Sequence, residues 1–263
     1  MIRETFNAVS GVYDSRALRF FPESAKHLAA LLGLKGEEQV LDVATGTGHA
    51  ALALAVRLPR GRVTAVDFSP GMLEQARKKA ASMQVRNVDF LERDMQDLEF
   101  ARSTFDAAVC AFGIFFVDDM DATLAHIADA VKAGGPVAIS GFQEDYFHPL
   151  KDLLFERLAA YGIPLPPQTW KRVATEAGCR ELFRNAGFTE VRVEQRNAGY
   201  FLESAEEWWD VVWNAGFRRM VGQIAPDDQE RFKREHLQEV ALLATKDGIW
   251  LDVGVLFAVG AKP

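Results

Sequence analysis

The chain has 263 residues, of which 49% are hydrophobic and 25% are charged, a composition typical of a globular protein with a sizeable core. Its formal charge of -7 argues against a nucleic-acid duplex or a membrane surface as partner, since neutralising their phosphates requires a basic face. The cysteines, Cys110 and Cys179, lie far apart and match no metal-ligand spacing, so no metal site is predicted.

The N-terminus has no apolar region typical of a signal peptide, and no apolar run reaches the roughly 18 residues of a membrane span. We therefore expect a cytoplasmic protein without stable membrane anchoring. The oligomeric state is left open.

Apolar runs and helical patterns alternate between residues 39 and 142. Strands are predicted at 39–44, 62–68, 88–94, 105–113 and 136–142. Helices are predicted between them at 48–57, 69–82 and 119–132, the second with Ser69 as its N-cap and Pro70 in its first position. Strands that are apolar on both faces and alternate with helices indicate a parallel sheet covered on both sides. Ligands of such sheets bind beyond the carboxyl ends of the strands.

The C-terminal part of the chain is less regular. Helices are predicted at 148–161 and 170–185, and strands at 189–197 and 249–263. Between these strands lies an insertion, about 203–246, with two predicted helices. Ser204 and Glu207 have the spacing of a capping box for the first, and Pro226 begins the second.

A glycine turn follows the first strand. Residues 46–51, GTGHAA, match the dinucleotide fingerprint G-x-G-x-x-G/A, and Asp67 lies 21 residues beyond Gly46, where an acid can bind a ribose diol. These residues alone are compatible with an NAD-dependent oxidoreductase.

Three further features favour an adenosine ligand with a cationic tail and no phosphate. Asp42 lies four residues before Gly46, where its charge disfavours a pyrophosphate and suits an ammonium or sulfonium group. Asp94 and Met95 end the third strand, where they can offer a carboxylate and apolar cover to adenine. The turn 67–72 also brings Phe68 and Met72 to positions where they can enclose an adenine ring.

The segments LDVATGTG, VDFSPGML, ERDMQDL and FDAAVCAFGIFF, in this order, resemble the successive motifs of class I S-adenosylmethionine (SAM) methyltransferases. Within this class the chain most resembles the ubiquinone/menaquinone C-methyltransferase-like branch (methyltransferase type 11), whose opening helix is similar to FNAVSGVYD. The resemblance covers residues 5–142. It implies a Rossmann-like α/β fold: a doubly wound sheet of about seven strands, mostly parallel with an antiparallel last strand, plus a helical cap or insertion.

The predicted organisation is a single domain. Its core comprises about 36–142 and 188–202 plus 249–263, with an N-terminal helical lid at 1–35 and the insertion at about 203–246.

The resemblance assigns cofactor contacts residue by residue. Asp42, Ala44 and Gly46 are expected at the methionine moiety, Asp67 at the ribose, Phe68 and Met72 on adenine, Asp94 and Met95 at the adenine edge, Ala111 near the sulfonium, and Tyr13 as a cover; Gly48 completes the glycine turn. Two residues depart from the common pattern of the class. Ala44 replaces its first glycine, although this branch accepts alanine there, and His49 stands where an acid or asparagine is frequent.

The acceptor side is less constrained by the sequence. Tyr146 and His148, in the loop after the fifth strand, are candidates for a base or an acceptor-orienting group; the alternative is an ordinary polar loop. Candidate walls of an apolar acceptor pocket are Phe20, Phe21, Phe115, Phe116, Trp209, Trp213 and Phe217. For these aromatic residues the alternative is packing in the core or between helices.

The sequence thus predicts an enzyme that transfers a methyl group from SAM to an O or C atom of a small, partly apolar organic acceptor. Residues 111–114, AFGI, lack the N/D-P-P-Y/F motif of nucleic-acid amino methyltransferases, which disfavours a nucleic-acid substrate. Two alternatives remain: an NAD-dependent oxidoreductase, and a non-catalytic protein that binds SAM or S-adenosylhomocysteine.

Overall fold

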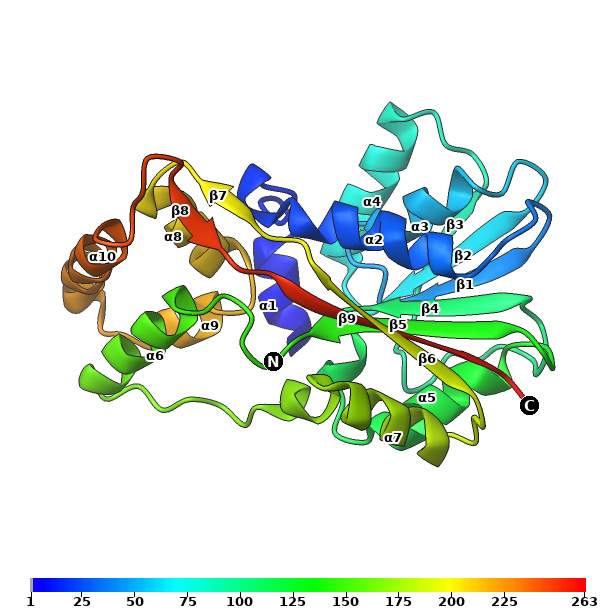
Figure 1. The fold of residues 1–263 in the computed structure, drawn as a ribbon. Coiled ribbons are helices and arrows are strands. Elements are labelled where there is room, and N and C mark those ends of the chain that lie inside the picture. Colours follow the sequence, from blue (N-terminus) through cyan, green and yellow to red (C-terminus); the bar gives the residue numbers. More distant parts are fainter. Residues whose placement is uncertain (1) are drawn as a thin grey trace.

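The structure, a computed structural model, describes residues 2–263 and is built on a seven-stranded sheet with the order β3-β2-β1-β4-β5-β9-β6 (Figure 1). The strands span Gln39–Val43 (β1), Arg62–Asp67 (β2), Val88–Glu92 (β3), Ala107–Ala111 (β4), Pro136–Phe142 (β5), Val191–Asn197 (β6) and Gly254–Ala261 (β9). The pairs from β3 to β5 are parallel, whereas β9 is antiparallel to both β5 and β6. The predicted Rossmann-like sheet with an antiparallel last strand is confirmed.

The central strands β1, β2 and β4 are buried along most of their length, as their continuous apolar sequences require. Their register brings Val43 beside Val66 on one side and beside Cys110 on the other. The loops that follow these three strands therefore leave the sheet at the same edge.

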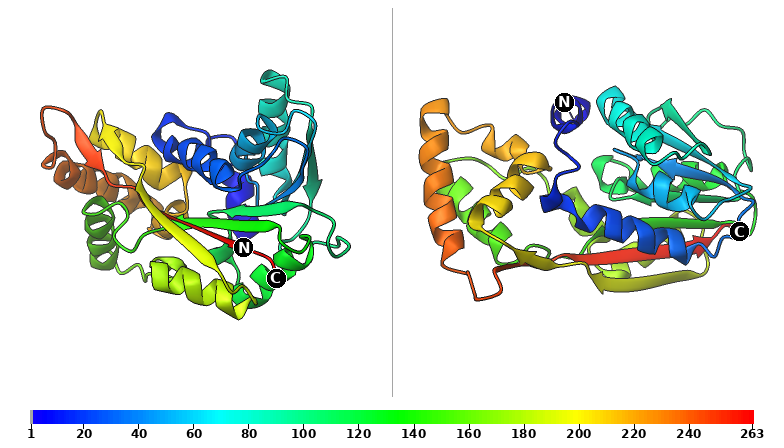
Figure 2. Two further views of the ribbon diagram at one scale, coloured as in Figure 1. Left: turned by 45° about the vertical axis from the view of Figure 1, so that its right-hand side comes forward. Right: turned by 90° about the horizontal axis from the view of Figure 1, so that it is seen from above.

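Helices cover both faces of the sheet. The helices α2 (Phe20–Leu31), α3 (His49–Ala55) and α4 (Pro70–Ser82) cover one face, and α5 (Met120–Asp129) and α7 (Glu176–Asn185) cover the other (Figure 1). The N-terminal helix α1 (Ile2–Val9) packs against α4 rather than on the sheet (Figure 2). None of the helices in residues 2–263 is both long and apolar enough to cross a membrane.

The start of α4 is as predicted. Ser69 is its N-cap, with its hydroxyl accepting a hydrogen bond from the amide of Met72, and Pro70 is the first helical residue. This cap determines where the chain turns after β2, and hence where the residues of that turn lie relative to the glycine turn.

The insertion differs from the sequence prediction in two ways. It contains three α-helices instead of two: α8 (Ala205–Asn214), α9 (Arg218–Val221) and α10 (Pro226–Ala241). It is also joined to the sheet by an unpredicted antiparallel ribbon of β7 (Tyr200–Leu202) and β8 (Ile249–Leu251). Together with α6 (Leu150–Ala160), these helices gather at one end of the molecule (Figures 1 and 2).

The predicted final strand, 249–263, is divided into β8 and β9. At the break, the carbonyl of Asp252 accepts a hydrogen bond from the amide of Phe147, and its carboxylate accepts one from Asn197. These bonds take the place of strand-to-strand hydrogen bonds at Asp252, so the chain can pass from the ribbon into the large sheet.

The predicted helix at 170–185 is also divided. A 3-10 turn spans Thr169–Val173, and α7 starts after Thr175, whose hydroxyl accepts a hydrogen bond from the amide of Gly178. A threonine that caps a helix in this way cannot be part of a continuous helix, which explains the interruption.

The cap of α8 also differs in detail from a capping box. Ser204 accepts a hydrogen bond from the amide of Glu207, as predicted. The Glu207 carboxylate, however, accepts its backbone bond from Glu203, one residue before the cap.

Candidate cofactor and acceptor site

A cavity lies at the carboxyl ends of β1, β2 and β4, beneath the N-terminal segment. Its walls combine the glycine turn, the turn after β2, the loop after β4 and residues of α1, α2 and their connection. The lining residues are Phe6, Tyr13, Phe21, Ala25, Ala44, Thr45, Gly46, Thr47, His49, Ala50, Asp67, Phe68, Met72, Met95, Ala111, Phe112, Gly113 and Phe116.

The glycine turn has an unusual backbone. Ala44, Gly46 and Gly48 all have left-handed conformations, with φ values of 54°, 56° and 85°. Gly48 is required by packing as well, because a Cβ atom there would lie 3.1 Å from the Cβ of Ala76 in α4. Gly48 therefore shapes the turn but does not line the cavity, whereas Ala44 and Gly46 do line it.

Asp67 closes β2 and connects two turns. One carboxylate oxygen accepts a hydrogen bond from the amide of Gly46 and the other from the amide of Ser69, both at 2.8 Å. The residue is buried, and this burial raises the pKa of its carboxyl group. The free lone pairs of the two oxygens suit hydroxyl donors, such as those of a ribose.

Asp42 lies behind the glycine turn and is completely buried, so it does not line the cavity. One of its carboxylate oxygens accepts a hydrogen bond from Thr45 Oγ1 at 2.6 Å, and the other has no hydrogen-bond partner. Burial, together with the nearby charge of Asp67, raises the pKa of Asp42 to about 7.

The residues predicted to contact adenine lie in two groups. Phe68, Met72 and Met95 line the cavity, as a ring-binding role requires. Asp94 is exposed and does not line it; its side chain accepts a hydrogen bond from the amide of Gln96.

The N-terminal segment covers the cavity. Phe6 of α1 and Tyr13 both line it. Asn7 fixes α1 to the turn after β2, because its side-chain oxygen accepts hydrogen bonds from the hydroxyl of Ser69 and the amide of Gly71. Sequence analysis did not select Phe6 or Asn7, although both lie in FNAVSGVYD, the segment that resembles the opening helix of the family.

His49, which departs from the family pattern, is engaged by the same segment. Its Nε2 lies 2.9 Å from a carboxylate oxygen of Asp14, which also accepts a hydrogen bond from Thr47 Oγ1 at 2.6 Å. Lys79 of α4 binds the other oxygen at 2.8 Å. These donors hold the pKa of Asp14 well below its usual range, although partial burial opposes them. An acid at position 49 would repel Asp14, so His49 connects the cover to the glycine turn.

The aromatic residues predicted for the acceptor pocket separate into two groups. Phe21 and Phe116 line the cavity, and Phe112, which sequence analysis did not select, lies beside Phe21 with their rings 5.2 Å apart. The others do not line the cavity and pack on residues of the core or the insertion. Phe20, Phe115, Trp209 and Phe217 are buried, and Trp213 is half-buried.

Neither candidate base lines the cavity. Tyr146 is buried with its ring stacked on Phe142, and this burial raises the pKa of its hydroxyl group. His148 is exposed and pairs with Asp152. The titratable side chains that line the cavity, among residues 2–263, are Tyr13, His49 and Asp67.

The doubly wound sheet, with a left-handed glycine turn after β1 and an acid that closes β2, is typical of class I SAM-dependent methyltransferases. A family model described as a methyltransferase domain matches residues 40–135.

Similarity to individual proteins extends further along the chain. The chain is 32% identical to the ubiquinone/menaquinone biosynthesis C-methyltransferase UbiE of Syntrophotalea carbinolica over 184 residues, which are 68% of this chain and 76% of that protein. It is 29% identical over 140 residues to the aklanonic acid methyltransferase DauC of a Streptomyces species, which covers 53% of this chain and 64% of that protein.

Among solved structures, the YcgJ protein of Bacillus subtilis superposes with a TM-score of 0.61 at 20% identity, covering 91% of this chain and 98% of that one. The similarity to UbiE shows that the chain belongs to the class I SAM-dependent methyltransferases, in the branch of the ubiquinone/menaquinone C-methyltransferases. It is a methyltransferase enzyme whose cofactor is SAM rather than a dinucleotide.

Proposed function

We propose that the enzyme methylates an oxygen or carbon atom of a small, partly apolar acceptor that reaches the site as an anion. The observation that carries this proposal is the aromatic part of the cavity wall, where Phe6, Phe21, Phe112 and Phe116 gather beside Tyr13. Aromatic walls favour a flat or apolar acceptor ring.

The titratable groups of the cavity support an acceptor that ionises by itself. Asp67 is occupied by two backbone amides, and His49 by Asp14. Burial and the nearby carboxylates of Asp67 and Asp14 raise the pKa of Tyr13, so near neutral pH it is a hydrogen-bond donor and not a base. Acceptors that are already anionic near neutral pH, such as carboxylates, acidic phenols and the enolates of acidic 1,3-dicarbonyl compounds, need no base from the protein.

SAM supplies a methyl group that its positively charged sulfonium activates. Ala44 and Gly46 would hold the methionine end, Asp67 the ribose, and Phe68, Met72 and Met95 the adenine, with Ala111 near the sulfonium. The remaining task of the protein is to orient the acceptor and exclude water. Orientation can lower a barrier by about 7–11 kcal/mol in favourable systems, and a dry site favours the union of an anion with a cation.

The names of the relatives are compatible with such acceptors. One is a C-methyltransferase of ubiquinone and menaquinone biosynthesis, and another acts on an organic acid, aklanonic acid. These names favour ring-bearing, acidic small molecules over nucleic acids or amines.

The test is a methyl-transfer assay with isotopically labelled SAM and a panel of hydroquinones, 1,3-dicarbonyl compounds, phenols, carboxylates and amines. We expect products only from acidic acceptors, and mass spectrometry of the products distinguishes O- from C-methylation. Across acceptors of different acidity, the pH at which the rate rises is expected to follow the acceptor's own pKa. A rise at one fixed pH for all acceptors, or transfer to neutral amines alone, would contradict the proposal.

A further inference from the structure

The helical insertion does not line the cavity, yet it is bound to the segment that does. Tyr13 and Phe21 lie on either side of the short 3-10 turn Arg16–Leu18, and their rings stack at 5.3 Å in the cavity wall. Phe21 also packs edge-on against Phe112. Any shift of residues 16–19 would therefore move both aromatic side chains.

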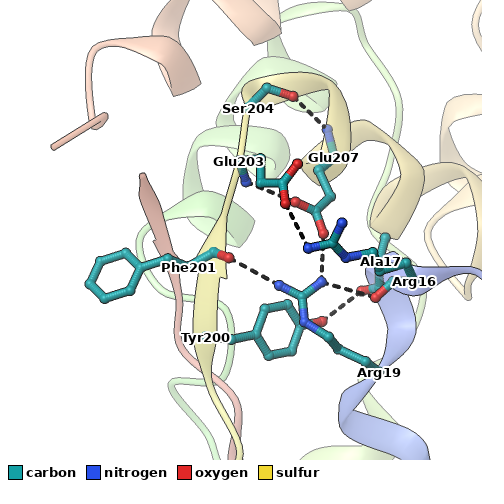
Figure 3. Close-up of polar contacts among 8 residues, drawn as sticks. All are labelled: Arg16, Ala17, Arg19, Tyr200, Phe201, Glu203, Ser204 and Glu207. Carbon is teal, nitrogen blue, oxygen red and sulfur yellow. Dashed lines mark hydrogen bonds and ion pairs between the residues drawn. The ribbon is translucent and has the colours of Figure 1, made fainter. Parts of the chain in front are cut away.

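Arg19 connects this turn to the base of the insertion (Figure 3). Its guanidinium group donates hydrogen bonds to the Glu207 carboxylate at 2.5 Å and to the carbonyl of Phe201 at 3.0 Å. It also donates to the carbonyl of Arg16 at 3.0 Å and lies 3.5 Å from the ring centre of Tyr200. One side chain thus contacts β7, α8 and its own turn.

The partners of Arg19 are themselves fixed. Tyr200 donates its hydroxyl proton to the carbonyl of Ala17 at 2.6 Å, a second bond between β7 and the same turn. The Glu207 carboxylate accepts the amide of Glu203 at the start of α8. Arg19 is therefore held between two structured elements, as Figure 3 shows.

A neighbouring ion pair provides a contrast. Arg16 and Glu203 interact at 2.6 Å, but their side chains are 71% and 69% exposed, so solvent screens the pair and its contribution is small. The side chains of Arg19 and Glu207 are 30% and 13% exposed. Of the two arginines, only Arg19 forms interactions protected enough from solvent to hold its turn against β7 and α8.

We propose that Arg19 is a positioning residue that couples the insertion to the cofactor cavity by fixing the Tyr13–Phe21 pair. Through this contact the insertion, whose aromatic residues lie away from the cavity, determines the shape of the acceptor end of the site. The coupling does not depend on which acceptor the enzyme uses.

Coupling between two sites is reciprocal, and this gives a sharp test. S-adenosylhomocysteine bound in the cavity is expected to slow amide hydrogen exchange in residues 200–207, although none of them lines the cavity. In Arg19→Gln this protection is expected to disappear, exchange in residues 10–22 to accelerate about tenfold or more, and S-adenosylhomocysteine to bind several-fold more weakly. Exchange is measured by mass spectrometry, and binding by calorimetry.

Three variants separate positioning from a general loss of structure. Arg16→Gln is the matched control and is expected to leave exchange and binding unchanged. Arg19→Lys retains the cation but loses the multiple hydrogen bonds, so partial recovery is expected. Tyr200→Phe removes only the bond to Ala17 and is expected to produce a smaller effect in the same segment, a result that stands even if Arg19→Gln folds poorly.

The proposal would be overturned if S-adenosylhomocysteine left the exchange of residues 200–207 unchanged in the wild-type enzyme, or if Arg16→Gln reproduced the effects of Arg19→Gln. Because these measurements use no acceptor, their outcome is independent of the proposed acceptor class.

Discussion

The Asp67 carboxylate accepts the amide of Gly46, and this bond joins the turn after β1 to the turn after β2. Its other oxygen accepts the amide of Ser69, the N-cap of α4. A single acid therefore sets the relative position of the two loops that form the cofactor end of the cavity. It has both a structural role and a position that suits ribose hydroxyls.

Asp67→Ala is predicted to weaken SAM binding by about 2–3 kcal/mol, or roughly 30- to 150-fold, because it removes the predicted ribose contact and leaves two backbone amides unpaired. Isothermal titration calorimetry with SAM measures this change. Asp89→Ala is the control, because Asp89 forms an exposed pair with Arg62 away from the cavity. Unchanged SAM affinity in Asp67→Ala would contradict the assignment.

Much of the fold could be predicted because its signals are local. Continuous apolar strands alternating with capped helices indicated the covered parallel sheet, and Ser69 with Pro70 marked the start of α4 correctly. The antiparallel last strand came from the resemblance instead. The ribbon of β7 and β8 was missed because strands of three residues, Tyr200–Leu202 and Ile249–Leu251, carry too short a pattern to recognise.

The cofactor side of the site could be predicted better than the acceptor side, for a physical reason. Motif residues such as Asp67 and Phe68 lie within a few residues of a strand end, so their place follows from the strand. Adjacent aromatic residues have no such constraint: Phe20 is buried in the core, whereas Phe21 lines the cavity. The contact of Asp14 with His49 depends on how α1 and α2 dock, which no local pattern specifies.

Ala44 adopts a left-handed backbone conformation that glycine accepts without strain. For alanine, this conformation destabilises the folded state by about 1–2 kcal/mol. Glycine avoids that strain, but its greater freedom in the unfolded state lowers the free energy of unfolding by about 0.4–1 kcal/mol. Ala44→Gly is therefore predicted to increase the free energy of unfolding by about 0.5–1 kcal/mol in denaturant titrations. Ala53→Gly, within α3, is the matched control and is predicted to decrease it by about 1 kcal/mol. Equal losses in both variants would show that Ala44 is unstrained.

The contribution of Asp42 to the stability of the ligand-free protein is predicted to fall as the pH rises from about 4 to about 7. The folded protein keeps this acid protonated up to its pKa of about 7, whereas the unfolded chain ionises it near 3.8. The unfolded state therefore binds fewer protons within this window, and each pH unit removes up to about 1.4 kcal/mol.

In Asp42→Asn this loss is predicted to be absent, so the difference in free energy of unfolding between variant and wild type changes steadily from pH 4 to pH 7. Urea unfolding at half-unit pH intervals measures it. Asp97→Asn, at an exposed position, is the control. A difference that does not vary with pH would show that Asp42 is already ionised in the folded state.

His236 is predicted to have the opposite effect over nearly the same pH range. It is completely buried in the insertion, where its Nε2 accepts the indole N–H of Trp208 at 2.8 Å, and its Nδ1 has no hydrogen-bond partner. Burial, assisted by the charge of Arg157, lowers its pKa to about 4. Below pH 6.5 the unfolded chain binds a proton at this residue that the folded protein does not bind. The contribution of His236 to stability is therefore fully present above pH 6.5 and is lost as the pH falls towards 4.

The loss over this window is about 3 kcal/mol at most. His236→Gln keeps a side-chain oxygen that can accept the indole N–H but cannot be protonated in this range. The free energy of unfolding of the variant, relative to that of the wild type, is therefore predicted to rise as the pH falls from 6.5 to 4. Unfolding followed by tryptophan fluorescence measures both proteins, and His148→Gln, at an exposed position, is the control.

Because Trp208 packs against Phe147 and Phe217, acid is expected to loosen this region before the sheet, with hydrogen exchange rising first in α8 and α10. Uniform loss of protection across the whole chain would contradict a local effect of His236.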